Sequence, residues 1–320
     1  MGFQKPKILV TGATGFIGKE VVNSLLAADK FQTVAIAVRK NIGFWDKRVV
    51  PHLINNLEHN LDWSFALEGI STIVHCAARV HVMSDKSINP LKDYRQVNVK
   101  GTINLAHQAA QAGVKRFVFI SSIKVNGETT NLGSPFTADD KPAPQDAYGI
   151  SKHEAEKGLI EIADSSDMDL VIIRPTLVYG PGVKANFLSM INWINSGIPL
   201  PLGSINNKRS MVSLDNLVHF ILVCLSHPKA ANQIFLVSDD EDISITDLLH
   251  RIYKISGKPN RLIAISPKLI KIIATIVGRK DIAIRLCSNL QVDIKKSCLL
   301  LNWKPPYNID KSLAKVIESL

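Results

Sequence analysis

Short runs of apolar residues rich in Val and Ile alternate with segments of helical periodicity over the first 175 residues. Such alternation is typical of a parallel sheet covered on both faces, because neighbouring parallel strands are joined by crossover helices. It predicts strands KILVTG (7–12), TVAIAV (33–38), HLINNL (52–57), STIVHCAA (71–78), RFVFIS (116–121) and LVIIRP (170–175), with helices near 16–28, 90–112 and 147–165. The chain is therefore predicted to be an α/β protein with a doubly wound parallel sheet.

The pattern loosens after Pro175. We expect a turn at TLVYGPG (176–182), a proline-restricted extended segment at GIPLPLG (197–203), a strand returning to the sheet at 233–239, and helices at 185–196, 244–256, 266–278 and 309–319. Residues 1–175 would form the main unit, with 210–240 returning to it. Residues 176–209 and 241–320 would form a smaller C-terminal lobe. Ligands of open α/β sheets bind beyond the carboxyl ends of the strands, so the cleft beside this lobe is the expected substrate site.

The segment ILVTGATGFIG places three glycines directly after the first strand and at the start of the first helix. Gly12 would allow the tight turn, Gly15 the close approach of a pyrophosphate, and Gly18 close packing of the helix on the sheet. Phe16 and Ile17 open the helix, whose free N–H groups and dipole favour an anion. In this context the motif predicts a dinucleotide site, against a glycine turn that serves packing only.

The end of the second predicted strand bears on which dinucleotide binds. An acid there would hydrogen-bond the ribose hydroxyl of NAD, whereas an arginine accommodates the 2′-phosphate of NADP. The sequence is AVRK, with Val38 at the position expected for the acid, followed by Arg39. NAD(P)(H) is therefore the predicted cofactor, with NADP(H) favoured over NAD; Arg39 as a solvated surface residue is the alternative.

Two further segments carry groups suited to proton transfer. AYGISKHEAEK places Tyr148 and Lys152 four residues apart on one face of a predicted helix, and RFVFISS ends the fifth strand at Ser122. A phenol is a poor proton carrier at neutral pH, and a fixed ammonium beside it favours the phenolate. We predict that these three residues are catalytic. The adjacent Ser121 is expected to be structural, since successive strand residues face opposite ways.

The motifs TGATGFIG, VNVKGT (97–102), FISS, YGISK, RPTLVYGPG and LNWKPP together resemble the extended short-chain dehydrogenase/reductase family, in its nucleotide-sugar epimerase, dehydratase and reductase branch. The resemblance covers essentially the whole chain. It implies a Rossmann-type fold in which Ser122 hydrogen-bonds the reacting sugar oxygen and Tyr148 moves its proton. Lys152 would bind the nicotinamide ribose and lower the tyrosine pKa.

The resemblance also implies further binding residues. On the cofactor side, the backbone at Ala77 and Ala78 would pass close to the dinucleotide, and Asn98 would brace the neighbouring strand. Asn56 stands where relatives usually have an aspartate near the adenine. The full set of expected cofactor-binding residues outside the glycine turn and the catalytic trio is Arg39, Asn56, Leu57, Ala77, Ala78, Asn98 and Pro175. On the substrate side the resemblance implies Asn186 and Arg209 on a diphosphate and the extended segment with Leu200 and Leu202 on uracil.

Two positions after Ser122 bear on the reaction. Related sugar 4,6-dehydratases carry an Asp-Glu pair where this chain has Ile123 and Lys124. Neither can serve as their acid or base, which disfavours dehydration. Lys124 could contact the substrate or lie as a solvated loop residue.

The preferred function is that of a reductase delivering hydride to C4 of a UDP-linked 4-keto-6-deoxy-hexosamine, of the UDP-N-acetylquinovosamine type used in bacterial surface polysaccharide. The near alternative is a UDP-hexose 4-epimerase with bound NAD, which would use the same residues. The second alternative is a dinucleotide sensor without catalysis. Such sensors commonly lose the tyrosine or lysine, and both are present here.

Composition narrows the setting and the partners. The 38 Lys and Arg exceed the 28 Asp and Glu, but they are scattered, so the net charge of +10 favours anionic small molecules over nucleic acid. The four cysteines show no C-x-x-C and no metal spacing with the histidines, so we expect no metal and a reduced, cytoplasmic setting. The apolar run at 267–278 is too short to cross a membrane and fits an amphipathic helix, either packed or lying on a membrane surface. A homodimer through 90–112 and 147–165 is a further expectation from the resemblance.

Overall fold

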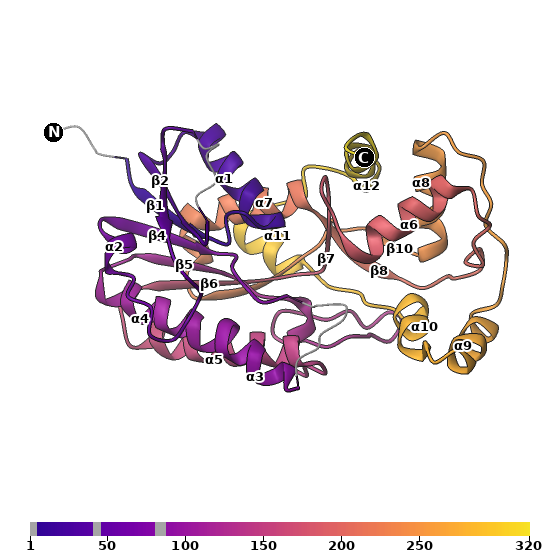
Figure 1. The fold of residues 1–320 in the computed structure, drawn as a ribbon, viewed down its shortest axis with the longest axis horizontal. Coiled ribbons are helices and arrows are strands. Elements are labelled where there is room, and N and C mark those ends of the chain that lie inside the picture. The colour runs from indigo at the N-terminus through magenta and orange to yellow at the C-terminus, as the bar shows by residue number, and fades with distance from the viewer. Residues whose placement is uncertain (1–4, 41–45, 81–87) are drawn as a thin grey trace.

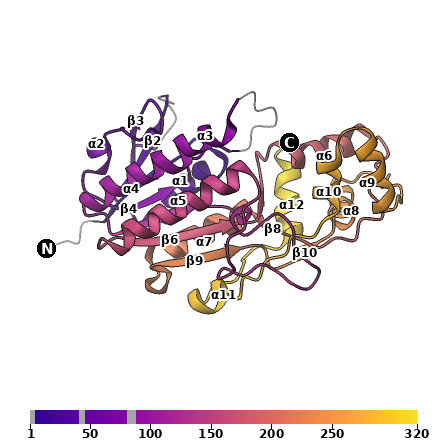
Figure 2. The same ribbon diagram turned by 90° about the horizontal axis from the view of Figure 1, so that it is seen from below.

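The computed structural model describes residues 5–40, 46–80 and 88–320. Its centre is a seven-stranded sheet in the order β3-β2-β1-β4-β5-β6-β9, with every neighbouring pair parallel (Figures 1 and 2). The strands are β1 (Lys7–Thr11), β2 (Thr33–Val38), β3 (Val49–Leu53), β4 (Ile70–His75), β5 (Arg116–Ile120), β6 (Asp169–Pro175) and β9 (Gln233–Val237). Strand order reverses between β1 and β4, the kind of switch point at which α/β sheets bind ligands. The predicted Rossmann-type fold class is confirmed.

Helices cover both faces of this sheet. Apolar side chains of the sheet form one core with α1 (Phe16–Ala28), α7 (Leu214–Ser226) and α11 (Lys295–Leu301). They form a second core with α2 (Ser64–Leu67), α4 (Thr102–Gln111) and α5 (Ala147–Asp164). Central strands are consequently buried on both sides and read as continuous apolar runs, as in β1, where Ile8, Leu9 and Val10 are fully buried.

Some predicted elements differ from the structure. The third strand was predicted at 52–57, but β3 pairs with β2 through Val49–Leu53, and it contains Pro51. An edge strand tolerates proline, because only one side of it joins the ladder. The single helix predicted at 90–112 consists of α3 (Pro90–Tyr94), a π-helix at Arg95–Gly101 and then α4.

The C-terminal part has its own small sheet and core. The strands β7 (Leu177–Tyr179), β8 (Arg209–Ser213) and β10 (Asp242–Ile243) form a three-stranded sheet in the order β10-β8-β7, so the turn predicted at 176–182 is in part a strand. These strands share a core with α6 (Ala185–Ser196), α8 (Ile245–Ile255) and α12 (Ile309–Glu318). The helices α9 (Pro267–Ile276) and α10 (Lys280–Cys287) lie at the end of the molecule away from the large sheet (Figures 1 and 2).

Candidate active site

The glycine turn between β1 and α1 is shaped by close backbone contacts. Gly12 has φ 68°, a left-handed conformation, and a Cβ there would lie 2.7 Å from the backbone nitrogen of Ala77. A Cβ on Gly18 would lie 2.2 Å from the carbonyl oxygen of Gly12. The turn therefore excludes side chains at both positions, because real Cβ contacts are longer. It brings the ends of β1 and β4 together at the switch point.

The start of α1 is suited to an anion. Gly15 is its N-cap and supplies no side-chain hydrogen bond to the first turn, which contains no acidic residue. Phe16 and Ile17 are half-buried, and their side chains pack against the core, so the backbone N–H groups are what this turn offers a ligand. These features fit the diphosphate of a dinucleotide.

The predicted adenosine end lies after β2 and β3. Val38 is buried, while Arg39 is exposed at the carboxyl end of β2. Asn56 is exposed, and its Nδ2 lies 3.4 Å from Glu58 Oε1, so the amide can still turn to a ligand. The carbonyl of Leu57 lies against Gly101, where a Cβ would come within 2.7 Å of the oxygen. A cavity of about 230 Å³ here is lined by Asn55, Asn56, Glu58, Asn60, Leu61 and Asp62.

Asn98 lies in the π-helix and is almost fully buried. Its Oδ1 accepts from the Arg79 N–H at 2.8 Å, and its Nδ2 donates to the Arg79 carbonyl and to Ser151 Oγ, both at 3.0 Å. The side chain thus ties the segment that follows β4, including the half-buried Ala77 and Ala78, to α5. This is the geometry expected of a brace. π-helical turns are rare and occur often at functional sites.

Ser122 and Tyr148 are brought together at the carboxyl end of β5. Ser122 is the N-cap of a short 3-10 helix at Ile123–Val125, and Asp146 is the N-cap of α5, accepting from the Gly149 N–H at 2.7 Å. The Ser122 side chain lies close enough to Tyr148 to lower the pKa of its phenol. Lys152 follows Tyr148 by one turn of α5, so two separate elements assemble the three predicted catalytic residues.

The pKa of the Tyr148 phenol was expected to be lowered, and in the structure it is raised. Burial raises the pKa of the Tyr148 phenol above its ordinary value, with Asp146 and Tyr94 adding to it, while the hydrogen bond from Ser122 lowers it. Lys152 is not among the causes of this shift, and its Nζ donates to the Ile120 carbonyl at 2.8 Å.

Lys152 is itself almost fully buried. Its Nζ lies 4.4 Å from the centroid of the Phe119 ring. Burial lowers the pKa of Lys152 from 10.5 to about 8, so the ammonium loses its charge more readily than an ordinary lysine.

A buried ion pair lies behind the trio and was not predicted. Arg174 of β6 donates to both oxygens of Glu156, from Nε at 2.9 Å and from Nη2 at 2.6 Å, and both side chains are 2% exposed. Ser121 Oγ donates to Glu156 Oε1 at 2.5 Å, and Arg174 Nη1 donates to Asn126 Oδ1 at 2.9 Å. Glu156 lies one turn beyond Lys152 on α5. This helical spacing was the available signal, although the arginine partner lies on another element.

Pro175 is the last residue of β6 and is buried, with Val237 of β9 as its partner in the sheet. This places it at the same carboxyl edge as the residues above.

Several predicted substrate residues have partners within the chain. The ammonium of Lys124 lies between Glu128 and Asp146, at 3.1 Å from Glu128. Arg209 Nη1 donates to the carbonyls of Arg285 at 2.9 Å and Ser288 at 3.2 Å, and burial lowers its pKa.

The extended segment expected at uracil is paired with another part of the chain. The Leu200 N–H donates to the Arg261 carbonyl at 3.0 Å, and the Leu200 carbonyl accepts from the Ile263 N–H at 2.8 Å. The side chains of Leu200 and Leu202 are buried in the C-terminal core. Asn186 lies in the first turn of α6, and its side chain is outside the described residues.

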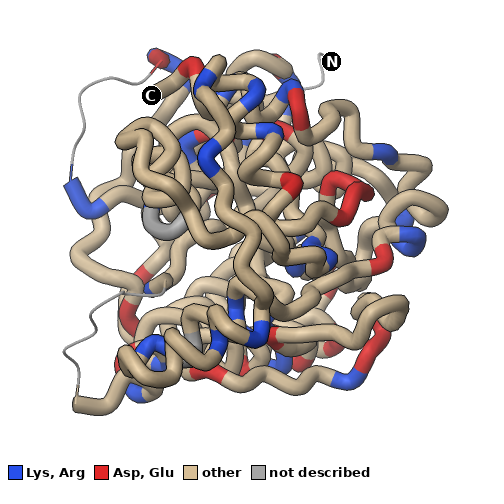
Figure 3. The backbone as a smooth tube through the Cα atoms, turned by 90° about the vertical axis from the view of Figure 1, so that its right-hand side faces the viewer, with Lys and Arg blue, Asp and Glu red and all other residues tan. Residues whose placement is uncertain are grey.

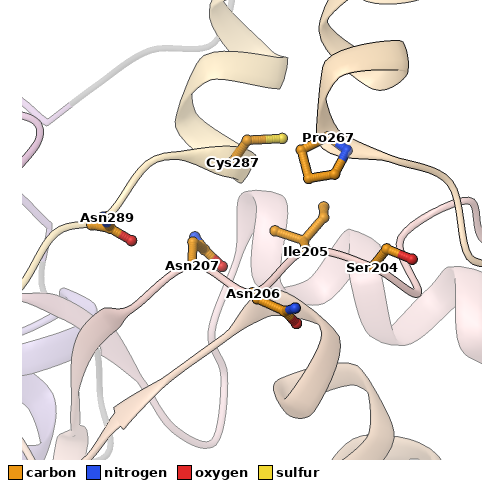
Figure 4. A pocket seen from close by; sticks show the side chains of 7 residues that line it. All are labelled: Ser204, Ile205, Asn206, Asn207, Pro267, Cys287 and Asn289. Atoms are coloured by element: carbon orange, nitrogen blue, oxygen red, sulfur yellow. The ribbon is translucent and has the colours of Figure 1, made fainter. Parts of the chain in front are cut away.

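A cavity of about 390 Å³ opens in the C-terminal part (Figure 4). Asn207 braces its wall by donating to the carbonyls of Leu286 at 3.1 Å and Ser288 at 2.9 Å. Arg209 supports the same wall through Arg285 and Ser288, rather than lining the cavity itself. The lining residues are Ser204, Ile205, Asn206, Asn207, Pro267, Cys287 and Asn289.

The parallel sheet, its glycine turn and the Tyr-Lys pair at the carboxyl edge define the class of short-chain dehydrogenases and reductases. A model of the NAD dependent epimerase/dehydratase family matches residues 8–238. UDP-glucose 4-epimerase of Vibrio cholerae is 46% identical over 313 residues, covering 98% of this chain and 94% of the relative. The chain belongs to the NAD-dependent epimerase/dehydratase family, and the predicted family is confirmed.

More distant relatives span the same length. The dTDP-4-dehydro-6-deoxyglucose reductase of Escherichia coli is 24% identical and covers 100% of this chain and 99% of the relative. The structure of MoeE5 in complex with UDP-glucuronic acid and NAD superposes with a TM-score of 0.78, at 23% identity and 98% coverage of both chains. UDP-glucuronic acid 4-epimerase from Bacillus cereus in complex with NAD gives 0.79, at 22% identity, covering 98% of this chain and 96% of that one. These two structures support the fold.

Proposed function

We propose that this chain transfers hydride between a nicotinamide dinucleotide and C4 of the hexose ring of a UDP-linked sugar. The observation that carries the proposal is the proximity of Ser122, which follows β5, to Tyr148 of α5, with Lys152 one turn further along that helix. Relatives whose names record UDP-glucose and dTDP-4-dehydro-6-deoxyglucose as substrates support a nucleotide sugar. Residues 176–209 and 241–320 would supply its binding lobe.

Each residue of the trio has a distinct task in this proposal. The backbone N–H groups at the first turn of α1 would hold the diphosphate of a dinucleotide, which would supply or accept the hydride. Ser122 would hold the C4 oxygen, and Tyr148 would exchange a proton with it. Lys152, with its pKa near 8, would contribute a positive charge that varies within the working pH range.

For the direction of reaction we propose net reduction of a UDP-4-keto-6-deoxy-hexosamine. Burial keeps the Tyr148 phenol protonated, which suits a general acid that donates to the alkoxide formed at C4. Val38 stands at the end of β2 in place of an acid that would hold the ribose, so an oxidised cofactor can leave more readily. Both features favour a reductase that exchanges its cofactor in every cycle, with NADP(H) accommodated by the exposed Arg39.

The second candidate is a UDP-hexose 4-epimerase. It is favoured by the 46% identity to the Vibrio cholerae UDP-glucose 4-epimerase over nearly the whole of both chains. Tyr148 would then take the proton of the C4 hydroxyl as the hydride passes from C4 to the cofactor. Once the keto-sugar has turned, the hydride would return to the other face of the ring and Tyr148 would give back the proton.

The two reactions separate in one pair of assays. Purified protein is mixed with UDP-4-keto-6-deoxy-N-acetylglucosamine and NADH or NADPH, and separately with UDP-glucose and UDP-N-acetylglucosamine. A reductase consumes one equivalent of reduced cofactor with the ketone, measured at 340 nm, and leaves the other two sugars unchanged. Conversion of either sugar to its C4 epimer without net cofactor consumption would identify the epimerase. Absence of both reactions would contradict C4 chemistry.

A further inference from the structure

The helix α9 carries an exposed apolar face. None of its residues is buried, in contrast to α8 and α12 of the same lobe. The exposed fractions are 46% for Leu269, 57% for Ile272, 48% for Ile273 and 79% for Ile276. Val277, which follows the helix, is 62% exposed, and Ile282 on the adjoining α10 is 50% exposed. A contiguous apolar surface of this kind marks an interaction site.

The arrangement of residues around α9 is that of a helix lying at an interface. At 100° per residue, Leu269, Ile272, Ile273 and Ile276 share one side of the helix. Ile270 is the residue of α9 that packs against the C-terminal core. At the same spacing Lys268 flanks the apolar side of the helix, where its long side chain can reach a charged surface while the isoleucines insert. Lys271 is also exposed but lies within electrostatic range of Cys287 on α10.

The segment that contains this face is strongly basic. Residues 254–285 contain eight Lys and Arg and one aspartate, giving +7 of the chain's net +10. Figure 3 looks onto the end of the molecule that carries α9 and α10, with Lys and Arg in blue and Asp and Glu in red. Among the described residues, no carboxylate pairs with Lys268, Lys271 or Arg279. The charge of this segment is thus available to an anionic surface.

We propose that α9 docks the protein on an anionic lipid bilayer, with Leu269, Ile272, Ile273 and Ile276 inserted into the headgroup region. Exposed apolar side chains beside unpaired lysines complement acyl chains beneath negative headgroups. None of the described helices is long and apolar enough to cross a membrane, so α9 lies along the surface. The docking is independent of the reaction proposed above.

Vesicle sedimentation tests this directly. Wild-type protein is mixed with vesicles of phosphatidylglycerol and phosphatidylcholine, or of phosphatidylcholine alone, at low and high salt. We expect partition onto the anionic vesicles that weakens on phosphatidylcholine alone and in high salt, because salt screens the lysines. Failure of the wild type to bind phosphatidylglycerol vesicles at low salt would overturn the proposal.

Variants separate the contribution of apolar insertion from that of the positive charges. Ile272→Glu together with Ile276→Glu should weaken partition at least tenfold, because both side chains lose their burial in lipid. Lys268→Gln and Lys271→Gln should each weaken it about fivefold on anionic vesicles. The control is Leu299→Glu, because Leu299 is 82% exposed and its helix α11 lies away from α9 in both views (Figures 1 and 2). Partition of this variant should be unchanged. Circular dichroism should show the same fold for all variants.

Two results would contradict the docking even if the protein binds vesicles. Equal partition of the Ile272→Glu/Ile276→Glu variant would place the contact elsewhere. A wild-type dimer in light scattering that becomes monomeric in this variant would show that a second copy of the chain covers the face.

Discussion

Replacing Lys152 with methionine should stabilise the protein in the absence of nucleotide while abolishing its reaction. Methionine keeps most of the length of the side chain and removes the buried ammonium. The pKa of Lys152 falls from 10.5 to about 8 through burial, and one pKa unit corresponds to ~1.4 kcal/mol. At pH 7 the charged lysine therefore costs the folded state roughly 3 kcal/mol relative to the unfolded chain.

The sign of the pH dependence follows from the direction of this change. The folded pKa lies below the unfolded one, so the unfolded chain binds more protons between pH 8 and 10.5, and wild-type stability rises across that range. The free-energy cost of the buried Lys152 ammonium to the folded state falls below about 1 kcal/mol at pH 10. Removing the ammonium also leaves the Ile120 carbonyl without its donor, which costs about 1 kcal/mol. The expected net gain for Lys152→Met is about 2 kcal/mol at pH 7, and it vanishes near pH 10.

Urea unfolding of both proteins at pH 7 and pH 10, followed by tryptophan fluorescence, measures the difference. Lys157→Met is the matched control, because Lys157 lies exposed on the same helix and its replacement should change stability by less than about 0.5 kcal/mol. The reasoning is refuted if Lys152→Met is less stable than wild type at pH 7, or if its gain is the same at both pH values.

Three other substitutions probe the framework of the site. Gly18→Ala should weaken NADH binding at least tenfold in a fluorescence titration and cost about 2 kcal/mol, because its Cβ would lie 2.2 Å from a carbonyl oxygen of the turn; unchanged affinity would show that the turn can shift. Asn98→Ala should cost about 3 kcal/mol in urea unfolding, since three hydrogen bonds are lost, and a cost below about 1 kcal/mol would contradict the brace. Glu156→Gln should cost about 3–5 kcal/mol by leaving Arg174 buried without its counter-charge, whereas Glu154→Gln on the exposed side should cost under about 1 kcal/mol. Equal costs for the two glutamates would refute the distinction.

The large sheet could be predicted because its signals are local. The helices expected at 16–28 and 185–196 have those bounds in α1 and α6, where the turn glycine Gly15 precedes α1 and Gly197 in a left-handed conformation ends α6. The helix α7 was not predicted. Its sequence nevertheless carries a helical signal, because the buried Leu214, Leu217, Val218, Ile221, Cys224 and Leu225 recur at intervals of three and four residues.

The sequence was sufficient to predict which residues form the candidate site, but not which hydrogen-bond and ion-pair partners they have. Tyr148 and Lys152 are placed by helical spacing, and their roles stay predictions. Which group Lys152 contacts depends on how α5 packs against β5, and residue spacing along the chain does not determine that packing. Lys124 illustrates the same point, since Asp146 lies 22 residues away in sequence and reaches the lysine only through the fold.

Turnover by the Tyr148→Phe variant tests the central claim most directly. Phenylalanine keeps the ring and removes the one group proposed to move the proton at C4. With the sugar nucleotide that the wild type converts, turnover should fall by about a hundredfold or more while NADH affinity stays within about twofold. Turnover within a few fold of wild type would contradict the claim that this phenol carries the proton.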